Sequence, residues 1–112
     1  MKILTPDRGD IVWVDFSPRR GREQSGLRPA LIISPIFYNK RAGLALACPI
    51  TSKVKKYDYE VLISEGEVKG AILCDQIRAI DLEERINKFS GKASAEIISL
   101  VQEKIKTLIF DY

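Results

Sequence analysis

The sequence predicts a mainly β fold, in which a small, strongly curved antiparallel sheet or barrel is followed by a C-terminal helix. Short apolar segments separated by glycine- and proline-containing turns fill most of the chain, a pattern typical of small antiparallel sheets and barrels. The last segment changes to a helical period. With 112 residues, the chain is expected to form one domain over residues 1–112.

The expected strands are read from apolar alternation and from the turn residues around them. In residues 10–16, Val12, Val14 and Phe16 fall on one face of a strand, and Trp13 falls on the other. Pro49 indicates a strand end or an edge strand, and Gly66 and Gly70 predict a turn. The remaining expected strands are residues 30–34, 44–50, 57–63 and 71–80.

The expected helix begins after Ser94, whose side chain suits an N-cap. Ile97, Val101 and Ile105 then recur at helical spacing up to residue 109. Such an apolar stripe predicts that the helix packs on the sheet.

The composition limits the location and the chemistry. No apolar run approaches the roughly 18 residues that span a bilayer, and charge and proline come too early at the N-terminus for a signal peptide. We therefore expect a cytoplasmic protein without membrane association, with Cys48 and Cys74 as buried reduced thiols. The chain contains no histidine, so neither a metal nor a cofactor is expected, and acid–base work must fall to Glu, Asp, Lys or Tyr.

A basic loop before Pro29 is the first candidate site. Residues 17–28 hold four arginines and one glutamate, so their charge of 4 − 1 = +3 equals the net charge of the whole chain. Glu23 can accept a proton from a ribose 2′-hydroxyl, and Arg28 can neutralise charge that develops on a phosphorane. The alternative is a solvated loop with a weak Glu–Arg ion pair.

Two further polar segments are candidates. Thr51 and Ser52 close an apolar strand and precede a lysine cluster (Lys53, Lys55 and Lys56), so they can hold a phosphate or form an ordinary strand end. Asp75, Gln76 and Arg78 interrupt an apolar strand and are either a recognition cluster or an internal hydrogen-bonded network. The aromatic residues can stack on bases, but most are more simply explained as core: Trp13, Phe37, Tyr38, Tyr57 and Tyr59.

These motifs together resemble the MazF/PemK (Kid) family of bacterial toxin–antitoxin modules. The similar segments follow the family's order over nearly the whole chain: residues 8–16, 23–30, 49–52, 75–81 and 94–109. Some PemK-like members use a histidine in the first loop, and this chain has none, so it resembles the MazF branch more closely.

The resemblance implies an SH3-like barrel of the CcdB/MazF type and a symmetric homodimer. It implies cleavage of single-stranded RNA, often mRNA, at a short sequence and without a metal. The implied reaction is attack by the 2′-hydroxyl, which leaves a 2′,3′-cyclic phosphate and a 5′-hydroxyl. It also implies neutralisation by an acidic antitoxin whose tail occupies the RNA groove.

The resemblance assigns roles residue by residue. Arg28 matches the catalytic arginine, Thr51 the catalytic threonine and Glu23 a proposed general base. Because a guanidinium keeps its proton, we assign charge stabilisation to Arg28 and expect water or Thr51 to relay the proton to the leaving oxygen. The expected RNA-binding or supporting residues are Arg22, Gln24, Ser52, Lys53, Asp75, Gln76 and Arg78.

Two other functions are compatible with the expected fold. A gyrase-binding poison of the CcdB type shares the barrel, but that group lacks the loop of residues 23–29. A catalytically inactive RNA-binding member is the second alternative.

Overall fold

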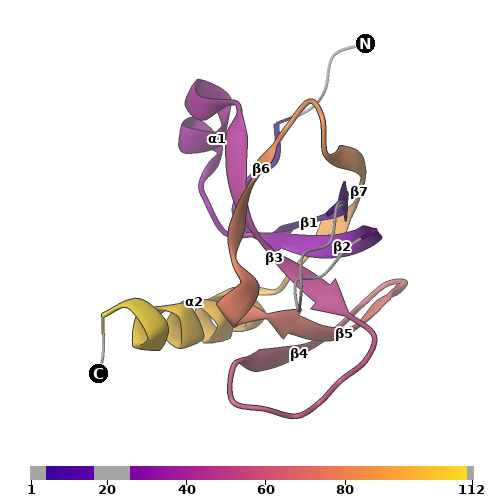
Figure 1. Cartoon of the computed structure of the whole chain (residues 1–112), viewed down its shortest axis with the longest axis vertical. Helices are drawn as coiled ribbons and strands as arrows, with labels where there is room; N and C mark the ends of the chain where they lie inside the picture. The colour runs from indigo at the N-terminus through magenta and orange to yellow at the C-terminus, as the bar shows by residue number, and fades with distance from the viewer. Residues whose placement is uncertain (1–4, 17–25, 111–112) are drawn as a thin grey trace.

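The computed structural model describes residues 5–16 and 26–110. The strands form one antiparallel seven-stranded sheet in the order β4-β5-β3-β2-β1-β7, and β6 pairs with β3 (Figure 1). This curled sheet and the helix after it confirm the expected fold class. The strands are β1 (Asp10–Asp15), β2 (Leu27–Ile32), β3 (Leu44–Thr51), β4 (Glu60–Glu65), β5 (Val68–Leu73), β6 (Arg78–Asp81) and β7 (Ile86–Lys92); the helices are α1 (Ile36–Ala42), the 3-10 turn η1 (Cys74–Gln76) and α2 (Ala95–Ile109).

Strand β3 is the centre of the sheet. Strand β2 runs along one side of it, whereas β6 and β5 share the other side, with Ala47 opposite Arg78 and Ile50 opposite Ile72. The turn η1 separates β5 from β6. The single strand expected over residues 71–80 is therefore wrong, because polar Asp75 and Gln76 leave the ladder in this turn.

The prediction that Pro49 marks a strand end or an edge strand is also wrong. Pro49 lies inside the central strand β3, opposite Ala30 of β2. On the other side of β3, however, the pairs with β6 stop at Ala47 and those with β5 begin at Ile50. Pro49 falls in this gap, and such interruptions are where a sheet tolerates proline.

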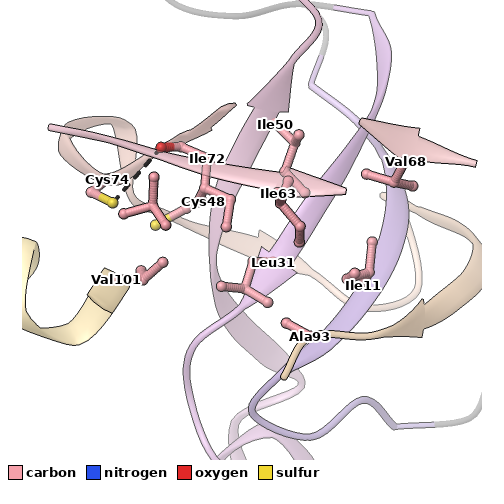
Figure 2. Close-up of a cluster of buried hydrophobic side chains, with 11 residues drawn as sticks. Ile11, Leu31, Cys48, Ile50, Ile63, Val68, Ile72, Cys74, Ala93 and Val101 are labelled. Carbon is pink, nitrogen blue, oxygen red and sulfur yellow. Dashed lines mark hydrogen bonds between the residues drawn. The ribbon is translucent and has the colours of Figure 1, made fainter. Parts of the chain in front are cut away.

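Both faces of the central strands are buried. One cluster of side chains, which includes Ile11 and Leu31, fills the space between the curled sheet and α2 (Figure 2). The other face carries a second cluster, which includes Val12, Ala30 and Ile80. Because neighbouring residues of a strand point to opposite faces, each central strand contributes to both clusters.

The predicted C-terminal helix is confirmed as α2, with Ser94 as its N-cap. The Ser94 hydroxyl accepts a hydrogen bond of 3.2 Å from the Ile97 amide, and Val101 is buried against the sheet. None of the helices in the described part of the chain combines the length and the apolar character required to cross a membrane.

Several local predictions need correction. Neither α1 nor β7 was expected from the sequence pattern. Gly70 lies within β5 instead of in the turn, which contains Gly66. Trp13 packs against the first core cluster as expected, but Phe37 is 76% exposed because α1 lies on the surface. Tyr38 and Tyr57 are exposed as well.

Candidate active site at one edge of the sheet

Arg28 and Thr51 lie at adjoining ends of the neighbouring strands β2 and β3. The two strands pair Ala30 with Pro49, and Arg28 lies two residues before Ala30 on β2, whereas Thr51 lies two residues after Pro49 on β3. Opposing residues of an antiparallel pair point to the same face. Because Arg28 and Thr51 are each two residues from the Ala30–Pro49 pair, alternation along the strands assigns both side chains to the face of that pair, at the same end of the sheet. Their joint catalytic role stays a prediction.

The Thr51 side chain is buried, with 5% of its surface exposed. Its Oγ1 accepts a hydrogen bond of 3.1 Å from the amide of Lys53. This bond uses an acceptor lone pair, so the hydroxyl proton remains able to donate to a phosphate oxygen. Ser52 and Lys53 follow on an exposed segment, residues 52–59, that connects β3 to β4.

Gly70 of β5 holds the backbone of Thr51 from the other side. A β-carbon on Gly70 would overlap the Thr51 carbonyl oxygen and lie 2.9 Å from its carbonyl carbon. Only glycine permits strands β3 and β5 to approach in this way. Sequence reasoning assigned Gly70 to a turn and missed this contact.

Arg78 approaches the same face from β6. It lies opposite Ala47, which shares a face with Thr51 because the two are four residues apart on β3. Its guanidinium carbon lies 5.6 Å from the centre of the Phe16 ring, within the range of a cation–π contact. A second guanidinium therefore stands on the surface that carries Arg28 and Thr51.

Of the basic segment before Pro29, the structure describes only the residues on either side of 17–25. Phe16 donates its amide to the carbonyl of Gly26 over 2.9 Å, so the two residues that flank 17–25 in the sequence lie together. Glu23, Gln24 and Arg22 lie outside the described residues. Their predicted roles stay predictions.

Asp75 is held by a tyrosine. The Tyr57 hydroxyl donates a short hydrogen bond to Oδ2 of Asp75, and the Tyr59 ring meets the Tyr57 ring edge-on at 6.1 Å between centroids. Although much of Tyr57 is exposed, partial desolvation of its phenol, followed by the hydrogen bond to Asp75, raises the pKa of Tyr57 above its usual range, so the phenol keeps its proton. Gln76 is half-buried in the same turn. Sequence reasoning did not foresee this pairing, because Tyr57 and Asp75 are distant along the chain.

The two cysteines are buried and unbridged, as expected. Burial raises the pKa of Cys74 to about 12 and moves the pKa of Cys48 well above its usual range. Within residues 5–16 and 26–110, no three histidine, cysteine or carboxylate side chains gather in a group that could hold a metal ion.

The fold and the site define a small curled-sheet protein that presents a hydroxyl and guanidinium groups on one face, a combination suited to a phosphodiester. Residues 7–109 match the family described as "PemK-like, MazF-like toxin of type II toxin-antitoxin system". The chain belongs to this family.

Named relatives agree with this assignment. The chain is 41% identical over 104 residues to the endoribonuclease toxin MazF of Escherichia coli strain K12, which covers 93% of this chain and 94% of that protein. The crystal structure of MazF from Deinococcus radiodurans superposes with a TM-score of 0.89 at 39% identity, over 95% of this chain and 97% of the other. A MazE–MazF crystal structure from the same organism gives a TM-score of 0.81 at 40% identity, over 95% and 96% of the two chains. The expected resemblance to the MazF branch of the family is confirmed.

Proposed function

We propose that the protein is an endoribonuclease toxin that cuts single-stranded RNA, including mRNA, at a short sequence and is neutralised by a cognate antitoxin. The observation that carries this proposal is that the paired strands β2 and β3 bring Arg28 and Thr51 to the same end and face of the sheet, in a chain that belongs to the MazF-like toxin family. The family match over residues 7–109 also supports a single toxin domain over residues 1–112.

The chemistry follows from these groups. The ribose 2′-hydroxyl attacks the adjacent phosphorus, the bond to the 5′-oxygen breaks, and a 2′,3′-cyclic phosphate and a 5′-hydroxyl form. Arg28 stabilises the charge on the phosphorane oxygens through two parallel N–H donors, and the Thr51 hydroxyl donates to one of these oxygens. Glu23 takes the 2′-hydroxyl proton, and water or Thr51 returns a proton to the leaving oxygen.

The neighbouring polar groups bind the RNA. Arg78 and Lys53 attract the phosphates electrostatically, and Ser52 donates a hydrogen bond. We assign base or backbone contacts to Gln24, Arg22 and Gln76. No step of this reaction assigns a role to a metal.

The assembly proposed for this toxin is a homodimer bound by an acidic antitoxin in the cytoplasm. The support is the likeness to MazF in a structure described as MazE–MazF. A basic site such as Arg28 with Arg78 and Lys53 is complementary to an acidic tail that competes with RNA.

A gyrase poison is the competing function for this fold. The similar proteins are named endoribonucleases, and the edge that carries Arg28 and Thr51 offers nuclease chemistry. Cleavage of single-stranded RNA in EDTA distinguishes the two functions, because a gyrase poison leaves the RNA intact. Under the same conditions, an inactive RNA-binding member would bind RNA without forming a cyclic phosphate.

The decisive experiment maps cut sites on a long defined RNA in EDTA with the wild-type protein, Arg28→Ala and Thr51→Ala. The expected result is cutting at one short sequence by the wild type, with 2′,3′-cyclic phosphate ends, and a loss of at least about 100-fold in rate for each variant. Wild-type rates in both variants, at equal folding, would show that the site lies elsewhere.

A further inference from the structure

We propose that Tyr57 and Asp75 are positioning residues for RNA binding: their hydrogen bond fixes residues 52–59, the segment that carries Lys53, Lys55 and Lys56, in the shape that receives the RNA backbone. This inference rests on the proposed function. It gives Asp75 a role that acts through Tyr57 instead of a direct contact with the reacting phosphate.

Local hydrogen bonds already shape this segment. The Lys53 amide donates to the Thr51 hydroxyl over 3.1 Å. Further along, the Glu60 carboxylate accepts from the amides of Lys55, at 3.1 Å, and Lys56, at 2.8 Å. These bonds join the segment to the strand ends on either side of it.

The backbone conformation of Lys56 shows that surrounding contacts determine the shape of residues 52–59. Its φ is 59°, and it is the one residue other than glycine with positive φ among those described. A lysine adopts this conformation against its own preference, so the surrounding contacts must determine it. The segment is therefore a built feature of the site.

The bond between Tyr57 and Asp75 is the side-chain link from this segment to η1, beside a backbone bond of 3.0 Å that the Cys74 amide donates to the Tyr59 carbonyl. Tyr57 lies in the segment itself, whereas Asp75 lies in η1, the turn that leads directly into Arg78 of β6. The link thus joins the lysine-bearing segment after Thr51 to the element that presents Arg78. The backbone bond joins the two elements at Tyr59, and the bond between Tyr57 and Asp75 adds the side-chain connection closer to the lysines.

Loss of the bond between Tyr57 and Asp75 should affect RNA binding more than the chemical step. If the link is cut, the lysines must be ordered when RNA binds, and this ordering weakens binding. Arg28 and Thr51 stay in place, because the register of β2 and β3 and the contact with Gly70 do not involve Tyr57. We therefore expect KM to rise while kcat changes little.

The test is a double-mutant cycle with Tyr57→Phe, Asp75→Ala and the double variant, measured as kcat and KM on a single-stranded RNA oligonucleotide that contains the mapped site. Alanine is used at position 75 because asparagine would keep an acceptor oxygen for the Tyr57 hydroxyl. Each single variant is expected to raise KM about tenfold, the size that follows from losing a hydrogen bond to a charged group. The double variant should match the singles, because all three break the same link. Tyr59→Phe is the matched control and should behave like the wild type.

Hydrogen exchange tests the link without catalysis. Tyr57→Phe and Asp75→Ala should both speed amide exchange at Lys53, Lys55 and Lys56, and Tyr59→Phe should not. If this arm succeeds while the wild type cuts no RNA, the proposed function fails but the positioning by the link stands.

Three outcomes would overturn the inference. The first is a loss of kcat in Asp75→Ala with wild-type kinetics in Tyr57→Phe, which would place Asp75 in direct contact with the RNA. The second is additive effects in the double variant. The third is unchanged exchange at the three lysines in both single variants.

Discussion

Gly70 lies against the peptide group of Thr51, so closely that a β-carbon at position 70 would also stand 3.2 Å from the Cα atom of Ser52. Thr51 is therefore held by β5, through its pairing with Ala71 and the close approach of Gly70. The position of its hydroxyl depends on the packing of β3 against β5 and not on one local motif.

Gly70→Ala should damage both stability and activity, and Gly91→Ala supplies a matched control. The φ angles are similar, 154° at Gly70 and 158° at Gly91, but a β-carbon at Gly91 meets nothing within 4 Å. Both variants carry about 1–3 kcal/mol of backbone strain. Only Gly70→Ala must also move the Thr51 backbone. We expect urea unfolding at a lower midpoint for Gly70→Ala than for Gly91→Ala, with a loss of RNA cleavage confined to Gly70→Ala. Equal behaviour of the two would contradict the close approach.

Two substitutions of Thr51 distinguish the contribution of its hydroxyl from that of its side-chain volume. Thr51→Val keeps the volume but removes the group that receives the Lys53 amide and, in the proposed mechanism, donates to the phosphorane. We expect kcat to fall about 100-fold to 1,000-fold, as for the loss of one donor at a developing charge. Thr51→Ser keeps the hydroxyl and should stay within about tenfold of the wild type. A Thr51→Val enzyme at full rate, by single-turnover assay, would rule out this role.

Arg28→Lys tests the planar fork of the guanidinium. Lysine keeps the charge but cannot make two parallel hydrogen bonds to a phosphorane. The expected result is a lower kcat with RNA binding retained, measured by single-turnover cleavage beside equilibrium binding. Wild-type kcat in Arg28→Lys would mean that a point charge is sufficient.

Arg78 should contribute to RNA affinity through its charge. Arg78→Gln removes the cation above the Phe16 ring, and a lost phosphate contact lowers the slope of log K against log salt by about 1. Arg78→Lys should restore most of the slope, because it restores the charge. If the slope is the same in all three proteins, Arg78 serves only to cover Phe16.

The buried thiols predict a fall in stability at high pH. Cys74 has a pKa raised from 9.0 to about 12 in the folded state. Below pH 9 the thiol is protonated in both states, so its contribution is constant. Between about pH 9 and 12 only the unfolded state ionises, and stability falls by up to about 1.4 kcal/mol per pH unit for this group. Urea unfolding at a series of pH values should show a shallower fall in Cys74→Ala than in the wild type. Parallel curves would contradict the raised pKa.

Much of the fold was predictable because its signals are local. Alternation in residues 10–16 and the helical stripe after Ser94 report burial of one face, which depends on the period of the element alone. The helix α1 was not predictable in this way. Its seven residues are too few for a periodic pattern, and Asn39 ties it down through bonds to the carbonyls of Pro6 and Ser34. Strand β7 has a mostly exposed, polar pattern and exists because β1 offers it a partner.

The sequence by itself determined the family, the fold class and the two groups most able to act on a phosphodiester, Arg28 and Thr51. These follow from residue types and their order, which are fixed along the chain. Only the tertiary structure decided that Gly70 packs on Thr51, that Tyr57 holds Asp75, and that β5 and β6 are separate strands. The physical reason is that these contacts join residues from different strands and turns, and they form only when the sheet curls and brings those elements together.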